Sequence, residues 1–274
     1  MSKIAAIQMA SGPNIQANLD EAAKLIDDAV AQGASLVVLP ENFALMSMTE
    51  AERVDFAEDE GKGAMQDFLS AQAQKNSIWL VGGTVPIKSN VNAKARAACF
   101  VFNDQGEQVA RYDKIHMFDV LIQDSDESYT ESETTDAGDE TVVVDTPFGR
   151  MGLAVCYDLR FPEMFRSLSD QGMELCVMPS AFTAMTGKYH WEPLVRARAI
   201  ENQCYMVAAD QGGFHINGRE TYGDSMIVDP WGNILDRLPS GSGVVVAEMD
   251  AEFLTNTRKN FPVLEHRRMN CKIN

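Results

Sequence analysis

The stretch GLAVCYDLRFPE (152–163) places one cysteine between two kinds of local structure. The apolar run MGLAVC (151–156) is typical of a buried strand, and FPEMFRSLSDQG (161–172) has helical spacing. Cys156 would therefore lie at a strand-to-helix turn, where a side chain is exposed and free backbone N–H groups can receive an oxyanion. A helix start also favours a thiolate. We regard Cys156 as a candidate nucleophile.

Helical and strand patterns alternate on both sides of this turn. The predicted strands are 3–9, 35–40, 78–85, 174–180, 204–210, 225–230, 233–237 and 243–250, and the predicted helices are 15–32, 63–76, 161–172 and 190–203. Two predicted hairpins, over 96–113 and at the turn 146–150, interrupt the alternation. The pattern predicts an α/β protein with two packed mixed sheets covered by helices. Because no Pro- or Ser-rich linker divides the chain, we expect a single domain over 1–274.

Composition excludes several classes of protein. The chain has 274 residues, 45% of them apolar, and a formal net charge of −17. Such a charge repels nucleic-acid backbones and anionic membranes, so neither partner is expected. The longest apolar runs are too short to span a bilayer, and the N-terminus lacks the apolar core of a signal peptide, so we expect a cytoplasmic protein. The acidic segment 124–140 is expected to be an exposed loop.

The cysteine pattern argues against disulfides and zinc. The five cysteines are an odd number and include no CxxC pair; they are Cys99, Cys156, Cys176, Cys204 and Cys271. Cys99, Cys176 and Cys204 lie in strand patterns, where a buried structural role is expected, and Cys271 lies in the C-terminal tail. We predict neither a metal nor a cofactor.

A cysteine nucleophile needs a base, and the residues alone leave its identity open. The usual partner is a histidine, but spacing does not choose among the four in this chain, so a Cys–His peptidase is one alternative. Glu41 and Lys114 each follow a predicted strand, SLVVLP and EQVARYD. Strand carboxyl ends converge on the ligand crevice of α/β folds, although a single charge at such a place is more often a solvated loop residue.

Three motifs taken together are more specific for function than any single residue at a strand end. VVLPEN (37–42), YDKIHMFD (112–119) and GLAVCYDLRFPE (152–163) have the order and spacing of the nitrilase superfamily of carbon–nitrogen hydrolases, and the resemblance extends from Lys3 to Arg268. It implies a four-layer α-β-β-α sandwich. It also implies homodimers or higher homo-oligomers that form through helices and a C-terminal segment, about 250–274.

The resemblance implies a role for four side chains and one backbone group. Glu41 would be the general base, Lys114 the cationic group, Cys156 the nucleophile, and Glu131, in YTESETT, a second glutamate near it. The backbone N–H of Tyr157 would join Lys114 in stabilising the oxyanion.

Within the family the chain is most similar to the Nit amidase branch. The similar stretches are 179–211, 222–232 and 261–268, with Asp224 standing where the branch usually has histidine. The implied reaction is amide hydrolysis through a cysteine thioester, with deaminated glutathione giving 2-oxoglutarate and Cys-Gly. The alternatives are an omega-amidase acting on α-ketoglutaramate, a nitrilase or carbamoyl hydrolase, and an inactive scaffold.

The expected partner is therefore a small amide that carries a carboxylate. Arg160 is placed to bind that carboxylate with two hydrogen bonds, although an ion pair with Glu163 or Asp158 is the structural alternative. Phe182 and Thr183 follow a strand end and are expected to line the pocket.

Overall fold

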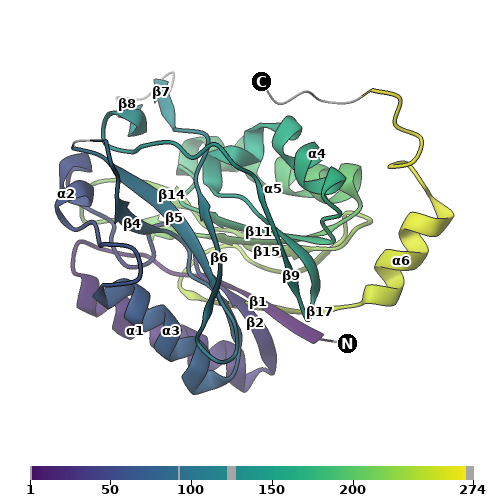
Figure 1. Ribbon diagram of the computed structural model, residues 1–274, viewed down its shortest axis with the longest axis horizontal. Helices are drawn as coiled ribbons and strands as arrows, with labels where there is room; N and C mark the ends of the chain where they lie inside the picture. The colour runs from purple at the N-terminus through teal and green to yellow at the C-terminus, as the bar shows by residue number, and fades with distance from the viewer. Residues whose placement is uncertain (1, 92, 122–127, 270–274) are drawn as a thin grey trace.

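The computed structural model describes residues 2–91, 93–121 and 128–269 (Figure 1). Cys271 and part of the acidic segment 124–140 lie outside the described residues. Among the helices that the structure describes, none is both long and apolar enough to cross a membrane.

A seven-stranded mixed sheet forms one half of the molecule, in the order β17-β1-β2-β3-β5-β4, with β6 beside β5. Its strands are β1 (Ser2–Gln8), β2 (Ala34–Val38), β3 (Trp79–Val81), β4 (Val85–Lys88), β5 (Ala95–Phe102), β6 (Gln108–Asp113) and β17 (Gly243–Met249). Strands β1, β2 and β3 are parallel, and β5 is antiparallel to both β3 and β6. Consequently β2 and β6 end at the same edge of the sheet.

A six-stranded mixed sheet forms the other half, in the order β16-β15-β12-β11-β10-β9. Its strands are β9 (Val142–Thr146), β10 (Gly149–Leu153), β11 (Leu175–Ser180), β12 (Tyr205–Asp210), β15 (Ser225–Val228) and β16 (Ile234–Leu238). The central strands β10, β11 and β12 are parallel. Two small hairpins lie outside both sheets: β7 (Asp119–Leu121) with β8 (Ser128–Thr130), and β13 (Gly212–Phe214) with β14 (Glu220–Tyr222).

Helices cover the outer faces of both sheets (Figure 1). Helices α1 (Ile15–Ala31) and α3 (Ala64–Asn76) pack on the first sheet, and α4 (Pro162–Asp170) and α5 (Ala184–Asn202) pack on the second. The remaining helices are α2 (Glu50–Asp55), α6 (Ala251–Asn260) and the 3₁₀ turns η1 (Glu131–Glu133) and η2 (Cys156–Arg160).

Strand β1 shows why residues 4–7 are all apolar. Ile4 and Ala6 contribute to the core between the sheets, whereas Ala5 and Ile7 contribute to the core beneath α1 and α3. Successive strand residues point to opposite faces, so a strand covered on both faces loses the usual polar alternation. These two cores confirm the predicted four-layer sandwich.

Two predicted elements were wrong in extent. The helix predicted at 190–203 begins at Ala184, after the N-cap Thr183, so His190 and Trp191 lie inside it rather than at its start. The strand predicted at 78–85 is two strands, because the chain turns at Gly83, whose φ is 54° and where a Cβ would lie 2.1 Å from the carbonyl oxygen of Pro40. Only glycine fits such a turn.

The predicted exposed loop at 124–140 was wrong for residues 128–133, whereas residues 136–140 form a loop as expected. Residues 128–133 form β8 and the turn η1, and Glu131 is buried. The two predicted hairpins are confirmed as β5–β6 and β9–β10.

Candidate active site

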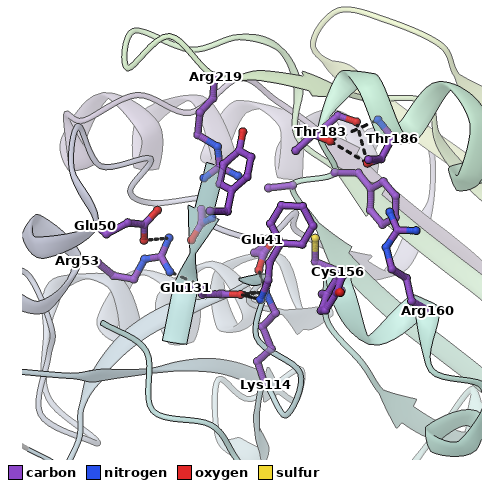
Figure 2. Close-up of a pocket in the computed structure, with 16 residues that line it drawn as sticks. Glu41, Glu50, Arg53, Lys114, Glu131, Cys156, Arg160, Thr183, Thr186 and Arg219 are labelled. Carbon is purple, nitrogen blue, oxygen red and sulfur yellow. Dashed lines mark hydrogen bonds and ion pairs between the residues drawn. The ribbon is translucent and has the colours of Figure 1, made fainter. Parts of the chain in front are cut away.

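Three strand ends bring Glu41, Lys114 and Cys156 to one pocket. Glu41 follows β2, Lys114 follows β6, and Cys156 follows β10 after two residues. Figure 2 shows the three side chains directed toward one another, with Glu131 beside Lys114. All four side chains are buried.

Lys114 lies between two carboxylates. Its Nζ is 2.8 Å from Oε1 of Glu41 and 3.0 and 2.9 Å from the two carboxylate oxygens of Glu131. Burial alone would lower the pKa of Lys114, but the charges of Glu131 and Glu41 outweigh burial and raise it. Lys114 is therefore a fixed ammonium group at neutral pH.

Glu131 is held as a carboxylate by its surroundings. The backbone N–H of Phe118 donates to its Oε2 at 2.8 Å, and Nη1 of Arg53 lies 3.6 Å from its Oε1. Although burial favours the neutral acid, the charges of Lys114 and Arg53 lower the pKa of Glu131. Arg53 in turn is paired with Glu50 at 3.2 Å.

Cys156 has an unusual backbone and a protonated side chain. Its φ of 47° is in the left-handed region, which is rare for a residue with a side chain and is found at strained functional turns. Burial and the charge of Glu41 raise the pKa of the thiol well above its ordinary value, and Lys114 and the N–H of Ala181 offset this only in part. The expected thiolate-favouring helix start was wrong, because Cys156 begins the short 3₁₀ helix η2 and the α-helix α4 begins only at Pro162. A base is therefore needed to deprotonate Cys156.

Buried polar contacts fix the turn that carries Cys156. Asp158 accepts hydrogen bonds from the Tyr112 hydroxyl at 2.7 Å and the backbone N–H of Val155 at 2.8 Å. The guanidinium of Arg198 donates to the carbonyl oxygen of Leu159 through Nε and Nη2. The turn is thus attached both to β6 and to α5.

Arg160 lies at the edge of the pocket, with its guanidinium carbon 5.0 Å from the ring centroid of Phe182 and 5.8 Å from that of Tyr157. Its Nη1 is 3.1 Å from Nδ1 of His190. Among the residues that the structure describes, no carboxylate forms an ion pair with Arg160, so the structural alternative with Glu163 or Asp158 is wrong. Burial lowers the pKa of this arginine.

The pocket contains every side chain that the sequence placed there and several that it did not. Tyr157, Phe182 and Thr183 line it as expected. The additional lining residues are Asn42, Glu50, Arg53, Phe118, Tyr129, Ala181, Thr186 and Arg219. Most come from loops and from the short helix α2, whose sequence EAERVD is typical of a solvated surface helix. Arg219 lies in RETYG, within the region 212–222 that forms the small β13–β14 hairpin.

Histidine does not serve as the partner of Cys156 in this pocket. Among the described residues that line it there is no histidine. Both ring nitrogens of His215 are engaged, by the Ser11 carbonyl and the Thr221 hydroxyl, and Nδ1 of His116 contacts Asp158. The described residues also contain no group of His, Cys, Asp and Glu able to hold a metal ion.

Asp224 lies outside the pocket lining and has its own partner. Both of its carboxylate oxygens accept hydrogen bonds from Arg237, and its carbonyl oxygen accepts one from Nε1 of Trp191 at 2.8 Å. The aspartate therefore has an arginine partner on β16.

Comparisons with known proteins show what this chain is similar to. A model of the family described as carbon-nitrogen hydrolase matches residues 3–259. A deaminated glutathione amidase of a Synechocystis strain is 44% identical, covering 96% of this chain and 97% of that protein. A deaminated glutathione amidase of Yersinia enterocolitica is 41% identical, covering 97% of this chain and 93% of that protein.

Solved structures share the architecture. The NitFhit protein of Caenorhabditis elegans is 38% identical, with a TM-score of 0.90, and the alignment covers 97% of this chain and 65% of that one. The Nit3 protein of Saccharomyces cerevisiae is 32% identical, with a TM-score of 0.87 and coverage of 98% and 97%. A mutant of an amidase from Nesterenkonia sp. AN1, 25% identical with a TM-score of 0.78 and coverage of 97% and 100%, carries acrylamide added at its active-site cysteine.

Proposed function

Because the chain belongs to the carbon–nitrogen hydrolase family, we propose that it is an amidase that hydrolyses deaminated glutathione to 2-oxoglutarate and Cys-Gly. The observation that carries the proposal is the arrangement of a buried thiol, a carboxylate and an ammonium group in one pocket. The choice of substrate rests on the names of relatives that align over nearly the whole chain.

In the first half of the reaction, Sγ of Cys156 attacks the amide carbon and forms the C–S bond. Glu41 accepts the thiol proton, which is consistent with the raised pKa of Cys156. The carbonyl electrons move to oxygen, and the resulting oxyanion is stabilised by the Lys114 ammonium and the backbone N–H of Tyr157.

The tetrahedral intermediate then collapses and the acyl-enzyme is hydrolysed. Protonated Glu41 donates its proton to the leaving nitrogen as the C–N bond breaks, which leaves a thioester on Cys156. Glu41 next accepts a proton from water, whose oxygen attacks the thioester carbon. Loss of the thiolate releases the acid, and Glu41 returns the proton to sulfur.

Glu131 would act by holding Lys114 in place rather than by transferring a proton. Lys114 and Arg53 keep it ionised, and a permanent carboxylate is a poor proton donor at neutral pH. Its two oxygens direct the ammonium group toward Glu41.

Arg160 would bind the free carboxylate on the acyl side of the substrate. Its guanidinium is partly buried, is near Cys156, and has no carboxylate partner among the described residues. A substrate carboxylate would supply the missing charge through a charge-assisted contact.

A substrate panel tests the proposal. Purified protein is incubated separately with deaminated glutathione, α-ketoglutaramate, an N-carbamoyl amino acid and a simple nitrile, and the released amine or ammonia is measured. We expect the highest kcat/KM for deaminated glutathione, weaker activity on α-ketoglutaramate, and none on the nitrile. A preference for α-ketoglutaramate would instead assign the chain to the omega-amidases.

We also propose that two or more copies associate through the C-terminal segment. Trp231, Phe253 and Phe261 are exposed in the described structure, and the rings of Trp231 and Phe261 lie 5.7 Å apart. Exposed apolar side chains grouped in this way are typical of protein interfaces. Sedimentation analysis of the wild type and of Phe253→Ser tests this proposal, with a lighter species expected for the variant.

A further inference from the structure

We infer that Arg219 binds a second carboxylate, on the leaving-group side of the scissile amide, so that the pocket selects substrates with a carboxylate at both ends. This inference rests on the proposed function, and it adds a specificity-determining residue to it.

The balance of charges in the pocket is the first observation. Four cationic side chains line it: Arg53, Lys114, Arg160 and Arg219. Lys114 is paired with Glu41 and Glu131, and Arg53 with Glu50 and Glu131. Among the described residues, neither Arg160 nor Arg219 forms an ion pair. The pocket of a strongly acidic protein thus contains two guanidinium groups whose charge no carboxylate of the described chain balances.

Arg219 is held in place, yet part of its hydrogen-bonding capacity is not used. Its guanidinium carbon lies 5.0 Å from the ring centroid of Tyr129, and Nη1 lies 3.9 Å from the sulfur of Met46. Its Nε is buried and has no acceptor among the described residues. A buried donor without an acceptor is costly, and a ligand that supplies the acceptor removes that cost.

The loop that carries Arg219 is fixed before substrate arrives. The backbone N–H of Arg219 donates to Oδ1 of Asn217 at 3.0 Å, and its carbonyl oxygen accepts from the N–H of His215 at 2.9 Å. The side-chain amide of Asn217 donates to the carbonyl oxygen of Ser47 at 2.8 Å. A side chain on such a fixed loop loses little conformational freedom when it binds a ligand.

The two unpaired arginines approach the pocket from different sides. Figure 2 shows Arg219 and Arg160 on opposite sides of the view, with Cys156 between them. Arg160 lies in the same turn η2 as Cys156, and its guanidinium carbon is 5.8 Å from the ring centroid of Tyr157, the residue that follows Cys156. Arg160 is therefore placed to bind the carboxylate of the short acyl part, and Arg219 is placed to bind the carboxylate of the longer leaving group.

The proposed substrate matches this arrangement. Its acyl part, 2-oxoglutarate, keeps one carboxylate, and the leaving dipeptide Cys-Gly ends in another. Two extended residues span about 7 Å, so the second carboxylate lies well away from the scissile nitrogen. In α-ketoglutaramate the leaving group is ammonia, which has no carboxylate for Arg219 to bind.

The experiment compares two substrates that differ only at the leaving-group end: deaminated glutathione and the same compound with its glycine carboxylate converted to the amide. The kcat/KM of each is measured with the wild type, Arg219→Gln and Arg219→Lys. The matched control is Arg150→Gln, because Arg150 is a partly exposed arginine on β10 that pairs with Asp145 and is not among the pocket-lining residues.

We expect the wild type to prefer the free carboxylate at least tenfold, and Arg219→Gln to reduce that preference to less than threefold. Arg219→Lys should restore part of it, and Arg150→Gln should leave it unchanged. A thiol-free dipeptide product analogue, Ala-Gly, should inhibit the wild type more strongly than Ala-Gly amide, and Arg219→Gln should abolish this difference.

Two other outcomes would overturn the inference in distinguishable ways. If a folded Arg219→Gln loses activity equally on both substrates, or if the wild type shows no preference, Arg219 has a structural role and the proposed amidase function still stands. If the wild type hydrolyses neither compound but hydrolyses another amide, the proposed function and the inference are both wrong.

Discussion

Tyr112 and Asp158 connect the strand that precedes Lys114 to the turn that carries Cys156. The Tyr112 hydroxyl donates to Oδ2 of Asp158 at 2.7 Å, and both side chains are fully buried. Tyr112 lies on β6 in the first sheet, whereas Asp158 follows β10 of the second. This bond therefore fixes the cation and the nucleophile relative to each other across the two sheets.

Replacing Tyr112 with phenylalanine should slow the reaction as well as destabilise the fold. A hydrogen bond to a charged group contributes about 1.5–3 kcal/mol, so we expect the free energy of unfolding to fall by roughly that amount. We also expect kcat to fall more than KM rises, because the turn loses its alignment. Chemical denaturation measures the free energy of unfolding, and steady-state kinetics measure kcat and KM.

Tyr205→Phe is the control, since the Tyr205 hydroxyl donates to the Asp250 carbonyl away from the pocket. An unchanged kcat in folded Tyr112→Phe would contradict this account.

Glu41→Gln should separate the electrostatic effect of Glu41 from its role as a base. The charge of Glu41 raises the pKa of Cys156, so its removal should lower the pH at which the thiolate forms. Turnover should nevertheless fall by about 10²–10⁴-fold, the usual contribution of general acid–base catalysis. Thiolate absorbance against pH, corrected with Cys156→Ala, measures the first effect. A thiol that titrates at higher pH in Glu41→Gln than in the wild type would be inconsistent with this geometry.

Glu131 should stabilise the fold at neutral pH and lose this effect in acid. Burial opposes its ionisation, but Lys114 and Arg53 lower its pKa in the folded state. Its contribution is therefore fully present above the unfolded value, about 4.3, and is lost as the pH falls through the lower folded value. Urea denaturation should show a larger stability difference between the wild type and Glu131→Gln at pH 7 than below pH about 4. Exposed Glu248→Gln is the control. Equal stability differences at both pH values would rule out the ionised carboxylate of Glu131 as the source of the stabilisation.

Arg160→Gln should weaken turnover of the substrate whose acyl part carries a carboxylate. Loss of a charge-assisted contact costs about 1.5–3 kcal/mol, which corresponds to at least tenfold in kcat/KM. An analogue with a neutral acyl end should lose less from the same substitution. Measuring kcat/KM of the wild type and Arg160→Gln with both compounds tests this prediction. Equal losses would indicate that Arg160 stabilises the turn rather than binding the substrate.

The main residues of this site could be predicted because three motifs together resemble one family. Glu41, Lys114 and Cys156 each follow a predicted strand, and strand ends converge in folds of this class, but this placement alone left the identity of the base open. Arg53 could not be predicted as a site residue, because α2 has the composition of a solvated helix. The side chain of Arg53 is buried by its contact with the turn around Glu131.

Long-range packing also explains the other differences between the sequence prediction and the structure. The guanidinium of Arg219 lies against the ring of Tyr129, a residue far away in the chain, and nothing in RETYG specifies that contact. The early start of α5 depends on the Thr183 cap and on Gly187, which packs against Tyr222 with no space for a Cβ. Such contacts arise between segments far apart in the chain, so local patterns do not reveal them.

The most direct test of the account is mass spectrometry of the acyl-enzyme. The protein is mixed with deaminated glutathione, quenched in acid within the first turnovers, and analysed intact and after proteolysis, with Cys156→Ala and Cys176→Ala as paired variants. The account predicts a 2-oxoglutaryl adduct on Cys156 in the wild type and in Cys176→Ala, and no adduct or turnover in Cys156→Ala. An adduct on another cysteine, or turnover by Cys156→Ala, would contradict it.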